Sequence, residues 1–152
     1  MSSKLLLINC AALSYRCAER LFSKHVSGRE HLARFAQENH LAALQPVFPA
    51  VTMPVQATML TGSLPSAHGC LSNTRFDRKG LTYNSWEQSA RLLDESPFWS
   101  KSWFAAKSAA TICWQFSFHN GADQVITPAP SHTPDGKTFS AIMTVPPALC
   151  EK

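Results

Sequence analysis

The chain has 152 residues, an ordinary apolar content, few charged residues and a net charge of +4. This length suits one domain with a hydrophobic core, and the composition is not that of a disordered chain. Lysines and arginines are scattered along the sequence, which argues against a nucleic-acid-binding surface. The apolar runs are too short for a membrane span or a secretory signal, so we expect a cytoplasmic protein without a membrane partner.

Short apolar runs alternate with segments of helical spacing along the chain. Strands are expected near residues 4–9, 41–48 and 108–115. Helices are expected near residues 30–39, 53–61 and 86–93. A turn at Asp77–Gly80 predicts a small hairpin. The alternation predicts an α/β fold over residues 1–152, a single domain with a mainly parallel sheet flanked by helices.

The five cysteines have irregular spacing and no C-x-x-C pair, which favours free thiols over a zinc ribbon. Four tryptophans lie between residues 86 and 114. Their rings fit two roles, packing in the core or stacking on a nucleobase, and the sequence leaves both open.

Thr52 stands between the second expected strand and the helix at 53–61. Pro54 falls in the first turn of that helix, where a missing N–H costs little, and Gly62 is suited to its C-terminal stop. A hydroxyl at this point lies near unpaired N–H groups at the positive end of a helix dipole, where phosphate binds well. The local pattern permits Thr52 to be either a helix N-cap or a phosphate-site residue.

A longer motif surrounds this threonine. The stretch from Phe48 to Asn73 reads F-P-x-x-T-x-P, followed by L-T-G-x-x-P-x-x-H-G-x-x-x-N. This motif resembles the nucleophile segment of the type I phosphodiesterase/nucleotide pyrophosphatase family, within the alkaline phosphatase superfamily. The resemblance implies an alkaline-phosphatase-like fold and a hydrolase acting on phosphate esters or nucleotides. His68 is interpreted as a structural loop residue, because the metal-binding histidines of the family come from later segments.

The resemblance also implies roles for three residues. The residue at Thr52 is the nucleophile of the family and a metal ligand, and the residue at Asn73 contacts the phosphoryl oxygens of the substrate. Family members use two metal ions, usually zinc. Their first strand usually ends in a metal-binding aspartate, and Asn9 stands at that position here. Asn9 fits two roles, a neutral metal ligand or a cap of the next segment.

The downstream metal ligands of the family, a D-x-x-x-H pair, a D-H pair and a final histidine, find no match in this sequence. We therefore interpret the chain as a truncated, N-terminal portion of such an enzyme, with a C-terminal half that could be encoded separately. The alternative function is a non-catalytic phosphate- or anion-binding module, or a remnant fragment.

Overall fold

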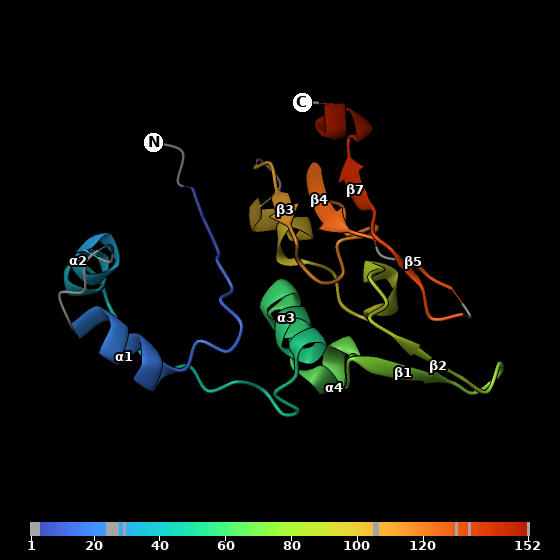
Figure 1. Ribbon diagram of the computed structural model, residues 1–152, viewed down its shortest axis with the longest axis horizontal. Coiled ribbons are helices and arrows are strands. Elements are labelled where there is room, and N and C mark those ends of the chain that lie inside the picture. The colour runs from blue at the N-terminus through green and yellow to red at the C-terminus, as the bar shows by residue number, and fades with distance from the viewer. Residues whose placement is uncertain are drawn as a thin grey trace. The chain divides into compact units, whose positions relative to one another are not determined.

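The computed structural model describes residues 4–23, 28, 30–104, 107–129, 131–133 and 135–151. It comprises two compact units, Met1–Gln45 and Pro46–Lys152, and each is described by itself (Figure 1). The expectation of a single domain over residues 1–152 stays a prediction. Among the described residues, no helix has the length and apolar content that a membrane span requires.

The unit Met1–Gln45 contains two helices that contact each other, α1 (Tyr15–Ser23) and α2 (Glu30–Glu38). The hydroxyl oxygen of Ser14 accepts a hydrogen bond from the N–H of Cys17 at 3.2 Å and so caps the start of α1. The helix expected at 30–39 is confirmed by α2. Ala18 and Ala33 are the buried small residues of these helices.

Two expected strands are wrong. Residues 4–9 and 41–48 are extended or irregular and belong to no strand, and Leu6 and Ile8 are 81% and 70% exposed. A strand needs a neighbour that completes its backbone hydrogen bonds, and the described part of Met1–Gln45 offers none. The apolar run at the start of the chain therefore has residues that favour a strand, but it has no pairing strand in the described part of its unit.

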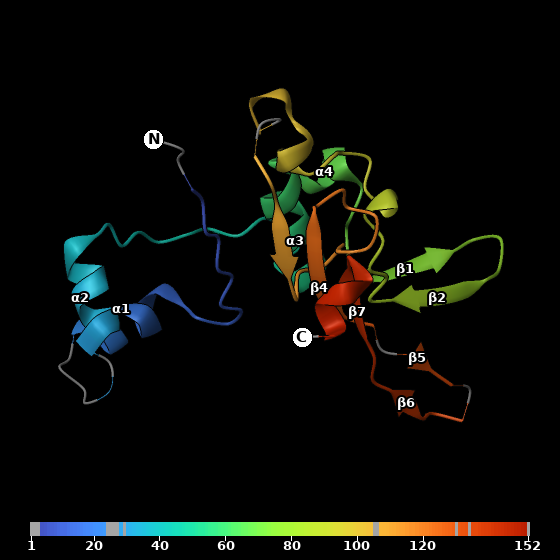
Figure 2. The same ribbon diagram turned by 90° about the horizontal axis from the view of Figure 1, so that it is seen from above.

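The unit Pro46–Lys152 begins with α3 (Thr52–Thr61), which confirms the helix expected at 53–61. It ends at Gly62, whose φ of 73° is left-handed and whose N–H donates to the carbonyl of Thr58. A short helix, α4 (Pro65–His68), follows. The expected hairpin is confirmed by the antiparallel strands β1 (Thr74–Asp77) and β2 (Thr82–Ser85), which project from this unit in Figures 1 and 2.

A three-stranded sheet has the order β3 (Ala110–Ile112), β4 (Gln124–Pro128), β7 (Ile142–Val145). The pair β3–β4 is parallel, β4–β7 is antiparallel, and β5 (Ser131–His132) pairs antiparallel with β6 (Thr138–Phe139). The strand expected at 108–115 is thus confirmed in its centre. The chain is α/β, but the expected dominance of parallel pairing is not observed among the described strands, because two of the three strands on which it depended do not form.

The remaining regular structure consists of 3-10 turns. These are η1 (Ala90–Leu92), η2 (Phe98–Ser100), η3 (Ser102–Phe104) and η4 (Pro147–Glu151). The helix expected at 86–93 is wrong beyond the single turn η1. Its backbone pairs elsewhere: the carbonyl of Gln88 accepts from the N–H of Phe118, and the N–H of Ala90 donates to the carbonyl of Phe118.

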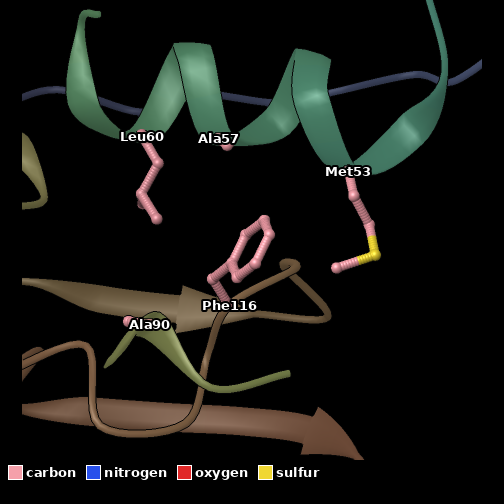
Figure 3. Packing of buried hydrophobic residues seen from close by; sticks show 5 residues of the cluster. All are labelled: Met53, Ala57, Leu60, Ala90 and Phe116. Atoms are coloured by element: carbon pink, nitrogen blue, oxygen red, sulfur yellow. The ribbon is translucent and has the colours of Figure 1, made fainter. Parts of the chain in front are cut away.

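The core of this unit lies beneath α3. Met53, Ala57 and Leu60 recur at helical spacing and pack against Phe116 and Ala90, and Figure 3 shows their side chains on one side of the helix. The carbonyl oxygen of the Gln56 side chain also accepts from the N–H of Gln115 at 2.9 Å. Apolar packing and this hydrogen bond fix α3 against the segment that follows β3.

Candidate functional site

The start of α3 corrects the expectation that Thr52 could be its N-cap. The N-cap is Val51, with extended backbone and no side-chain capping bond, and Thr52 is the first helical residue. The Thr52 hydroxyl forms no hydrogen bond with any described residue, and its side chain is half-buried. The Thr52 hydroxyl therefore makes no hydrogen bond that caps its own helix.

Asn73 provides the missing cap from a distant part of the sequence. Its side-chain carbonyl Oδ1 accepts the backbone N–H of Met53 at 2.9 Å. This bond satisfies one of the N–H groups that a helix start leaves unpaired. It also brings together Asn73 and the segment Thr52–Met53, two parts of the motif that are separated by the whole of α3 and α4.

Three donors remain at the start of α3 once this cap is made. They are the Thr52 N–H, the Thr52 hydroxyl and the Nδ2 amide of Asn73, none of which has a partner among the described residues. Pro54 has no N–H, and the N–H of Val55 is bonded to the carbonyl of Val51. The positive end of the helix dipole and these donors together favour an anion such as phosphate.

The loop that carries Asn73 is fixed by His68 at the end of α4. The side chain of His68 is fully buried. Its Nε2 lies 3.0 Å from the hydroxyl oxygen of Thr58 on α3, and its Nδ1 accepts the N–H of Cys70 at 3.2 Å. Burial lowers the pKa of His68, against the opposing effects of a backbone hydrogen bond and the Asp94 charge. These contacts agree with the structural role expected for His68, although the residue ends α4 and does not lie in a loop.

A cavity of about 250 Å³ adjoins this site. Met53 and Asn73 line it together with Phe76, Phe116 and the segment that follows Gly69. Thr52 is not among its lining residues, so the cavity extends from Asn73 rather than from the hydroxyl itself. Burial raises the pKa of the Cys70 thiol in its wall, which keeps that thiol protonated near neutral pH.

An ion pair lines the same cavity. The guanidinium of Arg75 donates to both carboxylate oxygens of Glu87, at 2.9 and 3.1 Å, which links β1 to the segment after β2. The two side chains are 56% and 30% exposed, so the pair contributes little to stability. Both side chains line the cavity that Asn73 lines, so the pair adds polar but neutral surface to its wall.

Two of the four tryptophans take the core-packing role, and stacking on a nucleobase stays a prediction. Trp99 and Trp114 pack against the core beneath α3, and the indole N–H of Trp99 donates to the carbonyl of Asn120. Trp86 and Trp103 are 50% and 67% exposed. No tryptophan lines the cavity beside Asn73.

The residues that the structure describes do not fit a two-zinc centre. Among the described residues, no group of three histidine, cysteine, aspartate or glutamate side chains could hold a metal ion. Stable zinc sites use three or four protein ligands, and Thr52 with a neutral asparagine falls short of that number. Asn9 lies in Met1–Gln45, outside any strand, and its convergence on Thr52 stays a prediction.

Comparison with known proteins identifies the family of the chain. A family model described as type I phosphodiesterase/nucleotide pyrophosphatase matches residues 6–152. The chain therefore belongs to this family. It is 34% identical over 70 residues to an uncharacterized pyrophosphatase/phosphodiesterase of Schizosaccharomyces pombe, a match that covers 45% of this chain and 14% of that protein. No solved structure gives a significant match.

Sequence reasoning missed how the site is assembled. It predicted Thr52 and Asn73 as site residues, but it did not predict that Asn73 caps α3 or that His68 joins Thr58 to Cys70. The absence of a capping residue at Val51 was the available signal, because a helix start without a local cap needs an acceptor for its N–H groups from elsewhere.

Proposed function

We propose that this chain carries the phosphoryl-binding part of a phosphoric ester hydrolase, with Thr52 as the nucleophile. The observation that carries the proposal is the cap of α3 by Asn73. Because Asn73 supplies the acceptor for the helix N–H group, the Thr52 hydroxyl stays available at the positive end of the helix. Family membership supports hydrolysis of phosphate esters or nucleotides as the reaction.

In the proposed reaction, the Thr52 oxygen attacks phosphorus. The hydroxyl gives up its proton to solvent as a bond forms between its oxygen and phosphorus, while the ester bond to the leaving group breaks and that group departs with the bonding electrons. The product is a phosphate ester of Thr52, which keeps the second ester group of a diester substrate and which water later cleaves. The Asn73 Nδ2 amide and the Thr52 N–H donate to the phosphoryl oxygens, where negative charge accumulates. The rest of the substrate extends into the cavity beside Asn73, whose wall includes apolar side chains and the Arg75–Glu87 pair.

The proposal includes divalent metal ions, with zinc as the first candidate from the family. Their ligands would have to come from outside the described residues, because the side chains in hand do not form a metal site. A separately encoded C-terminal half is the proposed source of those ligands. A threonine hydroxyl is a weak nucleophile unless it is activated, so we expect the chain alone to hydrolyse phosphodiesters very slowly or not at all.

Release of 4-nitrophenol from bis(4-nitrophenyl) phosphate, with zinc supplied, tests this function. We expect any slow release to disappear in Thr52→Ala and to persist in Thr52→Ser, which keeps a hydroxyl at the same position. Equal non-zero rates for the wild type and Thr52→Ala would exclude Thr52 as the nucleophile. Rapid zinc-dependent turnover by this chain would instead refute the proposal that its metal ligands lie elsewhere.

A further inference from the structure

The protonation state of His68 follows from its hydrogen bonds. The backbone N–H of Cys70 can only donate, so the Nδ1 atom that accepts it must lack a proton. A neutral imidazole without a proton on Nδ1 carries it on Nε2, and this N–H donates to the hydroxyl oxygen of Thr58. The ring therefore fits its site as the neutral Nε2–H tautomer. A second proton, on Nδ1, would face the N–H of Cys70, so that two donors would meet without an acceptor.

These hydrogen bonds join α3 to the loop that carries Asn73. Thr58 lies on α3, and Cys70 begins the short segment that leads to Asn73. The turn at His68 and Gly69 has a further hydrogen bond, because the N–H of Asp94 donates to the carbonyl of His68 at 3.2 Å. A Cβ atom added at Gly69 would lie 2.5 Å from a carboxylate oxygen of Asp94, which shows how closely this turn is packed.

We propose that neutral His68 is a positioning residue for Asn73, and that protonation of its ring releases Asn73 from the start of α3. This inference rests on the proposed function, since it assigns Asn73 to phosphate binding. Loss of the Cys70 N–H acceptor loosens the loop at residue 70, and the Asn73 amide then loses its fixed position beside Met53. The result is an anion site that weakens in acid.

The titratable groups around the ring decide the pH at which this happens. They are the Asp94 carboxylate, which favours the charged ring, and the Cys70 thiol, which burial keeps protonated and neutral. Desolvation outweighs the effect of Asp94, so the pKa of His68 lies below its usual value of about 6.5. The release therefore occurs on the acidic side of that value.

Nuclear magnetic resonance of the 15N-labelled chain tests the proposal without any need for turnover. At neutral pH we expect the His68 ring nitrogens to show the Nε2–H tautomer. As the pH falls, the ring, the Cys70 and Met53 amides and the Asn73 side-chain amide should shift with one shared midpoint. An Nδ1–H tautomer at neutral pH, or a ring that titrates while the Met53 and Asn73 signals stay fixed, would overturn the proposal.

Two variants separate this link from other effects of acid. In His68→Asn the side-chain oxygen can still accept from the N–H two residues later but does not titrate, so the acid shift of Asn73 should vanish. His40→Asn, at an exposed histidine of the other unit, should leave the shift unchanged. An acid shift of Asn73 that persists in His68→Asn would assign it to another group.

Affinity for bis(4-nitrophenyl) phosphate gives the functional readout, because a diester keeps its charge where inorganic phosphate titrates. Acid also makes the whole protein more positive, and this change in charge by itself would strengthen the binding of an anion. We expect wild-type affinity to fall about fivefold instead, the equivalent of one net hydrogen bond, and affinity in His68→Asn not to fall. Constant or rising wild-type affinity would refute this role for His68. Unchanged hydrolysis by a Thr52→Ala variant would refute the proposed function but would leave this role of His68 standing.

Discussion

Replacing Asn73 separates its two tasks, because capping α3 needs an acceptor and binding phosphate needs a donor. Asn73→Ala removes the acceptor of the Met53 N–H. Loss of a helix cap costs about 0.5–2 kcal/mol. Met53 is only 5% exposed, so water replaces the lost acceptor poorly and we expect the upper half of that range. Asn73→Asp keeps an acceptor and adds a negative charge that the helix dipole favours, but it removes the donor.

Thermal unfolding followed by circular dichroism measures the first task. For a unit of this size we expect Asn73→Ala to lower Tm by about 5–10 °C, and Asn73→Asp to match the wild type or exceed it slightly. Asn84→Ala removes an asparagine from the same unit and should change Tm little. Titration with bis(4-nitrophenyl) phosphate measures the second task, and both Asn73 variants should bind it more weakly. Equal Tm values for the wild type and Asn73→Ala would refute the capping argument.

Three further results are expected. In urea unfolding, Gly69→Ala should lower the free energy of unfolding by more than the roughly 1–2 kcal/mol that a left-handed backbone costs an alanine, because the added Cβ meets Asp94. The control Gly62→Ala has open space at its Cβ and should show the backbone cost alone. Leu60→Ala should cost about 2–5 kcal/mol in the same assay, since Leu60 is 1% exposed. Stability should fall as the pH drops below about 6.5, because the unfolded chain then protonates His68 before the folded chain does; a flat profile for wild type would contradict this.

The elements that the sequence predicted correctly are those with local signals. Pro54 in the first turn and Gly62 at the end define α3, and a turn at Asp77–Gly80 defines the hairpin. Most of their backbone hydrogen bonds join residues near in the sequence, so local signals suffice to predict where these elements lie. The helix 86–93 failed because its backbone pairs with Phe118, a contact that no local pattern indicates.

The strand at 4–9 failed for a related reason. Its apolar residues fit a buried strand, but strand formation also depends on a partner, which the described part of its own unit lacks. The site shows the same division. Thr52 and Asn73 were identified through the family motif, whereas the bond from Met53 to Asn73 spans 20 residues and became visible only in the folded chain.

The most direct test of the account is to locate a bound phosphodiester on the chain. Bis(4-nitrophenyl) phosphate should shift the backbone amide signals of Thr52 and Met53 and the Asn73 side-chain amide in 15N spectra at neutral pH. The same titration of Asn73→Asp should leave the Thr52 and Met53 signals nearly unmoved, because the donor is gone and the new charge repels the ligand. Shifts confined to other residues, or identical shifts in wild type and Asn73→Asp, would contradict a phosphoryl site at the start of α3.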